Sequence, residues 1–70
     1  MNRDELDEVE RLIDQHGIED LIEAIVDVCY EKEEHVRMNW QDHRLADAWR
    51  KIASVLERAN ERISKIEIPL

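Results

Sequence analysis

Apolar side chains recur every three or four residues along most of this chain, which is the spacing of one face of an α-helix. The first such stripe consists of Leu6, Val9, Leu12 and Ile13. Asn2 is followed three residues later by Glu5, as in a capping box, and Gly17 stands where a helix ends in a left-handed residue. The sequence therefore predicts a helix over residues 3–16.

A second stripe follows directly and predicts a helix over residues 18–38. It contains Ile18, Leu21, Ile22, Ile25, Val28 and Cys29, and with Val26 it spreads over roughly 160° at 100° per residue. An arc this broad suits packing against more than one neighbouring helix. The stripe thins beyond Glu31, where only Val36 and Trp40 continue it.

A third stripe advances in alternating steps of four and three residues, the spacing of a heptad repeat: Leu45, Trp49, Ile52, Leu56, Ala59, Ile63 and Ile66. Extending this repeat backwards places the charged Asp42 at an apolar position, so we expect a turn at residues 38–41. Asn39 is the expected N-cap of a third helix over residues 41–66. One continuous helix of about fifty residues, some 75 Å long, is the alternative. Pro69 favours an extended tail over residues 67–70.

The expected fold is all-α: a single domain over residues 1–70 in which a short N-terminal helix precedes a long antiparallel helical hairpin. The first helix would be about 20 Å long and the third about 39 Å, so one chain cannot cover the apolar arcs of its own long helices. We therefore expect a homodimeric helical bundle. The residues expected in its core or dimer interface are Ile25, Cys29, Leu45, Trp49, Ile52, Leu56 and Ile63.

Charge narrows the possible partners. The chain has 18 acidic and 10 basic side chains, a net charge of −8, which argues against direct binding to the phosphate backbone of nucleic acid. The acids are concentrated in residues 1–35, where thirteen acids and three bases give −10, whereas residues 36–70 hold five acids and seven bases, giving +2. No apolar run approaches the roughly 20 residues of a membrane span. With one unpaired cysteine and no targeting signal, a cytoplasmic protein is expected.

An acidic ridge follows the polar side of the second helix and is the main candidate for partner binding. Its expected members are Asp20, Glu23, Asp27, Glu31 and Glu34. The simplest interpretation is a solvated face; the functional ones are a docking surface for a basic protein and a surface that imitates nucleic acid in an inhibitor. Trp40 is expected to fold back as a lid over the hairpin turn, or else to be an exposed anchor for the partner.

The sequence contains few candidate catalytic or metal-binding residues. His35 and His43 flank the expected turn and, with Glu31 or Asp47, form a weak candidate for a metal site. Cys29 lies in the apolar stripe and is expected to be a core residue. The chain has no glycine-rich phosphate loop, no Gly-x-Ser-x-Gly and no Cys-x-x-Cys motif. We therefore expect a non-enzymatic protein-binding module, an adaptor or regulator without a cofactor.

Overall fold

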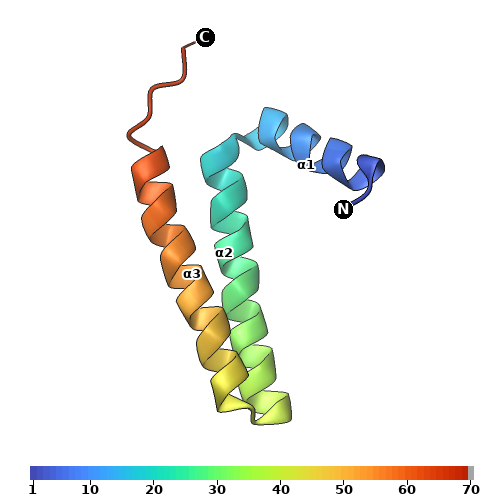
Figure 1. Ribbon diagram of the computed structural model, residues 1–70, viewed down its shortest axis with the longest axis vertical. Coiled ribbons are helices and arrows are strands. Elements are labelled where there is room, and N and C mark those ends of the chain that lie inside the picture. Colours follow the sequence, from blue (N-terminus) through green and yellow to red (C-terminus); the bar gives the residue numbers. More distant parts are fainter. Residues whose placement is uncertain (70) are drawn as a thin grey trace.

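The computed structural model describes residues 1–69, and this part of the chain is helical with no strands (Figure 1). Its elements are α1 (Arg3–His16), α2 (Ile18–His35), η1 (Val36–Trp40), a short π-helix, and α3 (His43–Ile63). α2 and α3 run antiparallel side by side, whereas α1 leaves the open end of this pair at an angle (Figure 1). We call α2, η1 and α3 together the hairpin.

The ends of α1 are defined by local hydrogen bonds. The Asn2 side chain accepts from the Glu5 backbone N–H at 2.8 Å, and the Glu5 carboxylate accepts from the Asn2 N–H at 3.0 Å, which completes the capping box. Gly17 has a φ of 88° and donates its N–H to the Ile13 carbonyl at 2.7 Å. A side chain at this φ is strained, so glycine lets the chain turn sharply from α1 into α2.

The connection from α2 to α3 differs from the sequence expectation. α2 ends at His35 and continues directly into the wider π-helical turn of η1. Gln41 then takes a left-handed conformation with a φ of 52°. α3 then begins at His43, two residues later than expected. Its N-cap is Asp42, which accepts from the Leu45 N–H at 3.0 Å. Asn39, the expected cap, instead donates its side-chain N–H to the His35 carbonyl at 3.0 Å.

α3 also ends earlier than expected, at Ile63 instead of residue 66. Lys65 and Ile66 donate their backbone N–H groups to the carbonyls of Arg62 and Ile63, the tighter i to i−3 pattern of a fraying helix end. Ile66 is 64% exposed, so packing against the described residues does little to stabilise another turn. Residues 67–69 are not helical, and Leu70, which belongs to the expected tail, lies outside the described residues.

The core lies between α2 and α3. It is centred on Val26, Cys29 and Ala53, with Ile22, Trp49 and Leu56 half-buried around them. Ala46 and Ala53 are completely buried, so the inward face of α3 follows the spacing Ala46, Trp49, Ala53 and Leu56. Small side chains at the inward positions let two helices approach closely, since interaxial distances depend on the residues at the contact.

Consequently, several large apolar side chains expected in the core or dimer interface lie on the surface of the single chain. The exposed ones are Ile25, Leu45 and Ile52, and Val28 and Val55 are exposed as well. At 100° per residue, Ile25 and Val28 lie on one side of the core line of α2, and Ile52 and Val55 lie on the corresponding side of α3. We call Ile25, Val28, Leu45, Ile52 and Val55 the apolar face.

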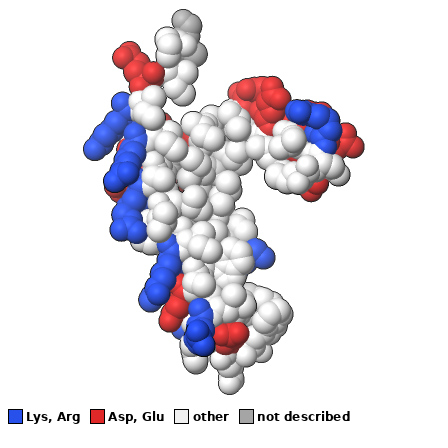
Figure 2. All heavy atoms as spheres, viewed as in Figure 1, with Lys and Arg blue, Asp and Glu red and all other residues white. Residues whose placement is uncertain are grey.

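The molecule is a single layer of helices. Its principal extents are 47 × 30 × 15 Å, and the smallest is close to the diameter of about 10–12 Å of one helix with its side chains. Figure 2 views it along this thin direction and shows a broad uncharged surface on the hairpin, with Lys and Arg along the outer edge of α3. None of the described helices is long and apolar enough to cross a membrane.

Candidate protein-interaction surfaces

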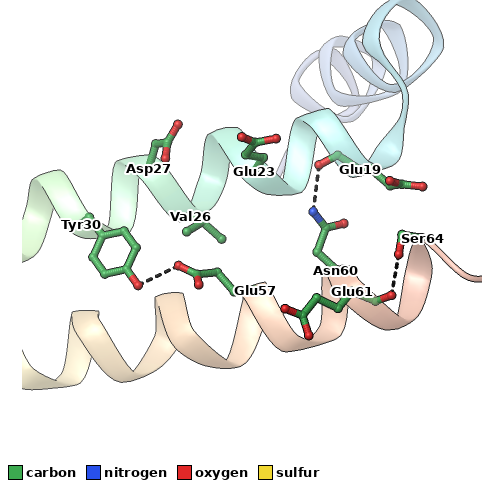
Figure 3. Close-up of a pocket in the computed structure, with 9 residues that line it drawn as sticks. All are labelled: Glu19, Glu23, Val26, Asp27, Tyr30, Glu57, Asn60, Glu61 and Ser64. Atoms are coloured by element: carbon green, nitrogen blue, oxygen red, sulfur yellow. Dashed lines mark hydrogen bonds between the residues drawn. The ribbon is translucent and has the colours of Figure 1, made fainter.

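The side of the hairpin opposite the apolar face contains an acidic groove between α2 and α3 (Figure 3). Its volume is about 420 Å³. The residues lining it are Glu19, Glu23, Val26, Asp27 and Tyr30 from α2, and Glu57, Asn60, Glu61 and Ser64 from the end of α3 and the residue after it. Five of these nine carry a carboxylate, so the groove is a concentrated source of negative potential.

Two hydrogen bonds join the helices across this groove. The Tyr30 hydroxyl donates to the Glu57 carboxylate at 2.7 Å, and the Asn60 side-chain N–H donates to the Glu19 backbone carbonyl at 3.1 Å (Figure 3). The bond to Glu57, with further contributions from burial and from the Glu57 charge, raises the pKa of Tyr30 above its usual value. Tyr30 therefore keeps its proton and fixes the orientation of one carboxylate in the groove.

The carboxylates of the groove are available for an incoming cation. Within residues 1–69, none of Glu19, Glu23, Asp27, Glu57 and Glu61 is in an ion pair. The Asn60 side-chain oxygen is buried and has no hydrogen-bond partner in the structure. An uncompensated cluster of this kind favours the binding of positively charged groups and is weakened by salt.

The structure regroups the acidic ridge expected from the sequence. Glu23 and Asp27 line the groove, whereas Asp20, Glu31 and Glu34 are exposed elsewhere on α2. Glu57 and Glu61 join the site from the opposite helix and were not expected. Their spacing of four residues places them on one side of α3, but which side faces α2 depends on the register of the helix pair, which sequence periodicity alone leaves undetermined.

A second polar cluster joins α2 and α3 near the turn. The Arg37 guanidinium donates to Asp47 at 2.9 Å and to Glu33 at 3.1 Å. The hydrogen bond from Arg37 is the main reason that the pKa of Asp47 lies below its ordinary value, and the two carboxylates raise the pKa of Arg37. Arg37 therefore links the end of α2 to the start of α3, so Asp47 has a structural partner.

The two histidines of the expected metal site have different neighbours. The His35 ring nitrogen lies 3.1 Å from the Asn39 side-chain nitrogen, and the His43 ring nitrogen lies 3.3 Å from Arg37. Asp47 is paired with Arg37, as described above. In the part of the chain that the structure describes, no three His, Cys, Asp or Glu side chains form a group that could hold a metal ion.

Trp40 does not cover the hairpin turn, so the expected lid is wrong. Its side chain is 67% exposed, with its ring edge-on to the His35 ring at a centroid distance of 6.3 Å. Trp49 is half-buried, and the Lys32 ammonium lies 5.3 Å from its ring centroid in a cation–π contact. Trp40 and Trp49 both line a hollow of about 410 Å³ at the hairpin turn, with Lys32, His35, Val36 and Leu45.

Comparison with known proteins adds no family to these observations: no protein-family model, curated protein or solved structure matches the chain.

Proposed function

We propose that this chain is a non-enzymatic protein-binding module that acts as a homodimeric helical bundle and binds a basic segment of another protein in its acidic groove. The observation that supports this proposal best is the division of the hairpin into two unlike faces. One face carries exposed aliphatic side chains, and the other carries five carboxylates without ion-pair partners among the described residues.

The groove has the chemistry that recognises lysine and arginine. Its carboxylates accept charge-assisted hydrogen bonds from ammonium and guanidinium groups, which are about twice as strong as neutral ones. Val26 lies among the lining residues and offers an apolar surface for the methylene stem of a long basic side chain. The Asn60 side-chain oxygen, which is buried near Glu19 and has no hydrogen-bond partner among the described residues, is an additional acceptor at that end of the groove.

Charge reversal in the groove tests this proposal. Glu23→Lys with Glu61→Lys places two cations in the groove, and we expect the tagged variant to lose the basic proteins that the wild-type chain captures from its host. Asp20→Lys with Glu34→Lys changes the net charge equally on the exposed part of α2 and is the matched control. Sedimentation checks that both variants remain dimeric. Capture by the wild type should also fall with added salt, because exposed charges are screened.

Equal capture by the wild type and both variants would contradict groove binding.

Competition with duplex DNA separates ordinary docking from imitation of nucleic acid. If DNA does not displace the captured protein, that protein binds the groove through a surface other than its nucleic-acid site, as expected for an adaptor. Displacement by DNA would instead favour the inhibitor that imitates nucleic acid.

A further inference from the structure

The single chain exposes more surface than a folded monomer of its mass. Its accessible area is 5959 Å², whereas a compact monomeric protein of this mass exposes about 4,600 Å². The excess is about 1,300 Å² per chain, and obligate homodimers bury about 1,000–2,500 Å² on each subunit. The excess therefore matches the area that a second copy of the chain would bury on each subunit.

The shape of the molecule also indicates that a second copy covers the apolar face. Protein domains bury the apolar stripe of a helix against a second layer, and this chain forms one layer only 15 Å thick. Ile25, Val28, Ile52 and Val55 are each between 45% and 56% exposed. A second hairpin offers an equally long apolar face with the same arrangement of side chains, so two copies can close on each other as a four-helix bundle.

Two arrangements of such a bundle are possible, and the charges distinguish them. If the two-fold axis runs across the hairpin, perpendicular to its helices, each helix stacks on its own copy in the partner. The basic edge of α3 then meets the basic edge of the partner's α3. If the axis runs along the hairpin, α3 stacks on α2 of the partner. Every contacting helix pair is antiparallel in both cases, so helix packing alone does not choose between them.

The edges of the layer carry opposite charge. Lys and Arg line the outer edge of α3 (Figure 2). At 100° per residue, four basic residues lie opposite the buried Ala46 and Ala53, and within residues 1–69 they form no ion pair: Arg44, Lys51, Arg58 and Arg62. On the other edge, Glu31 lies on the side of α2 opposite its core line at 100° per residue, and α1, which projects beyond α2 (Figure 1), holds six acids and two bases. Only a two-fold axis along the hairpin brings these opposite edges together; an axis across it places like charges side by side.

We propose that a second copy covers the apolar face about a two-fold axis parallel to the hairpin, so that the basic edge of each α3 lies along the acidic α1 and α2 of its partner. This inference rests on the homodimer of the proposed function and assigns its interface and orientation. Both hairpin turns then lie at the same end of the bundle. The acidic grooves remain outside, one on each outer surface.

The distance between the two hairpin turns tests this arrangement. Met38 lies in η1 at the turn and is 71% exposed, so Met38→Cys in a Cys29→Ala background accepts a nitroxide label there. Pulsed electron paramagnetic resonance should give a separation on the order of 20–25 Å, set by the width of the bundle. An axis across the hairpin separates the labels by about 30 Å or more, because α3 alone is about 32 Å long.

The possible results are distinct. A short distance in a dimer supports the proposal, and a long distance in a dimer overturns the orientation while leaving the homodimer intact. A monomeric mass with no dipolar coupling overturns both. Circular dichroism checks that the labelled variant is folded. If Cys29→Ala disturbs the core, the label is attached at Met38→Cys with Cys29 kept, because that thiol is only 4% exposed and reacts slowly.

Discussion

Asp42 shows how much a single side chain contributes to the hairpin. It accepts the Leu45 N–H at 3.0 Å and thereby satisfies one of the free backbone donors at the start of α3. Gln41 precedes it in a left-handed conformation, which usually favours glycine. The start of α3 therefore depends on this cap, because no glycine or proline marks the turn.

Replacing the cap tests this assignment. We expect Asp42→Ala to lower the free energy of unfolding by about 0.5–2 kcal/mol in urea denaturation, because the N-terminal amides of α3 lose their acceptor. Asn39→Ala is the matched control and should have a smaller effect, since Asn39 bonds to the preceding turn. A larger loss for Asn39→Ala than for Asp42→Ala would place the start of α3 at residue 39 in solution.

Asp47 gives the hairpin a defined dependence on pH. Its folded-state pKa is lowered, first by the hydrogen bond from Arg37, so the ion pair stabilises the fold above the unfolded pKa of about 3.9. That contribution is lost as the pH falls through the lower folded-state value. The difference in unfolding free energy between the wild type and Asp47→Asn should therefore be largest near neutral pH and should shrink below about pH 4.

The measurement is a series of thermal or urea unfolding curves from neutral pH down to acid. Asp20→Asn is the control, because the Asp20 carboxylate is in no ion pair within the described residues. A difference between wild type and Asp47→Asn that stays constant over the whole range would show that Arg37 does not hold Asp47 ionised.

At the scale of elements, the packing of α2 on α3 depends on small residues. Ala53 is completely buried against Val26 and Cys29, so a larger side chain must push the helices apart. We expect Ala53→Leu to lower the free energy of unfolding by about 1–3 kcal/mol, measured by urea denaturation. Ala24→Leu makes the same change at an exposed position of α2 and should be nearly neutral. Equal stability of the two variants would show that the helices pack less closely at Ala53.

These elements also show which features the sequence can predict. The ends of α1 were predictable because Asn2, Glu5 and Gly17 act through local hydrogen bonds and backbone angles. The heptad on α3 was expected to supply the core or dimer interface, and only part of it packs within the chain, where Trp49 and Leu56 are half-buried against the core. Ala46 and Ala53 take the inward positions, and Ile52 remains on the surface. Periodicity locates an apolar face but does not tell which neighbour covers it.

The acidic groove was predictable only in part, for a related reason. Glu23 and Asp27 belong to one helix, so their common side followed from spacing along the sequence. Glu57 and Glu61 reach the same groove only because α2 and α3 pack in one particular register. The close approach at Ala53 and the wide turn of η1 fix that register, and neither has a local sequence signal as clear as a glycine.

At the scale of the whole molecule, shape and charge both favour self-association. The radius of gyration is 14.5 Å, whereas a compact chain of this length has about 11 Å, so the protein is extended and flat. The net charge of −8 divides into an acidic half and a slightly basic half. A flat layer with one apolar face and oppositely charged edges is suited to pairing with itself.

The solution mass tests this central claim most directly. Sedimentation equilibrium across the micromolar range should give 16.8 kDa, which is twice the chain mass of 8.4 kDa. Ile52→Glu on the apolar face should shift the mass toward 8.4 kDa with helicity retained, because a charge would be buried in the interface. Ser54→Glu, exposed on α3 outside the apolar face, should leave the dimer intact. A wild-type mass of 8.4 kDa at all concentrations would contradict the account.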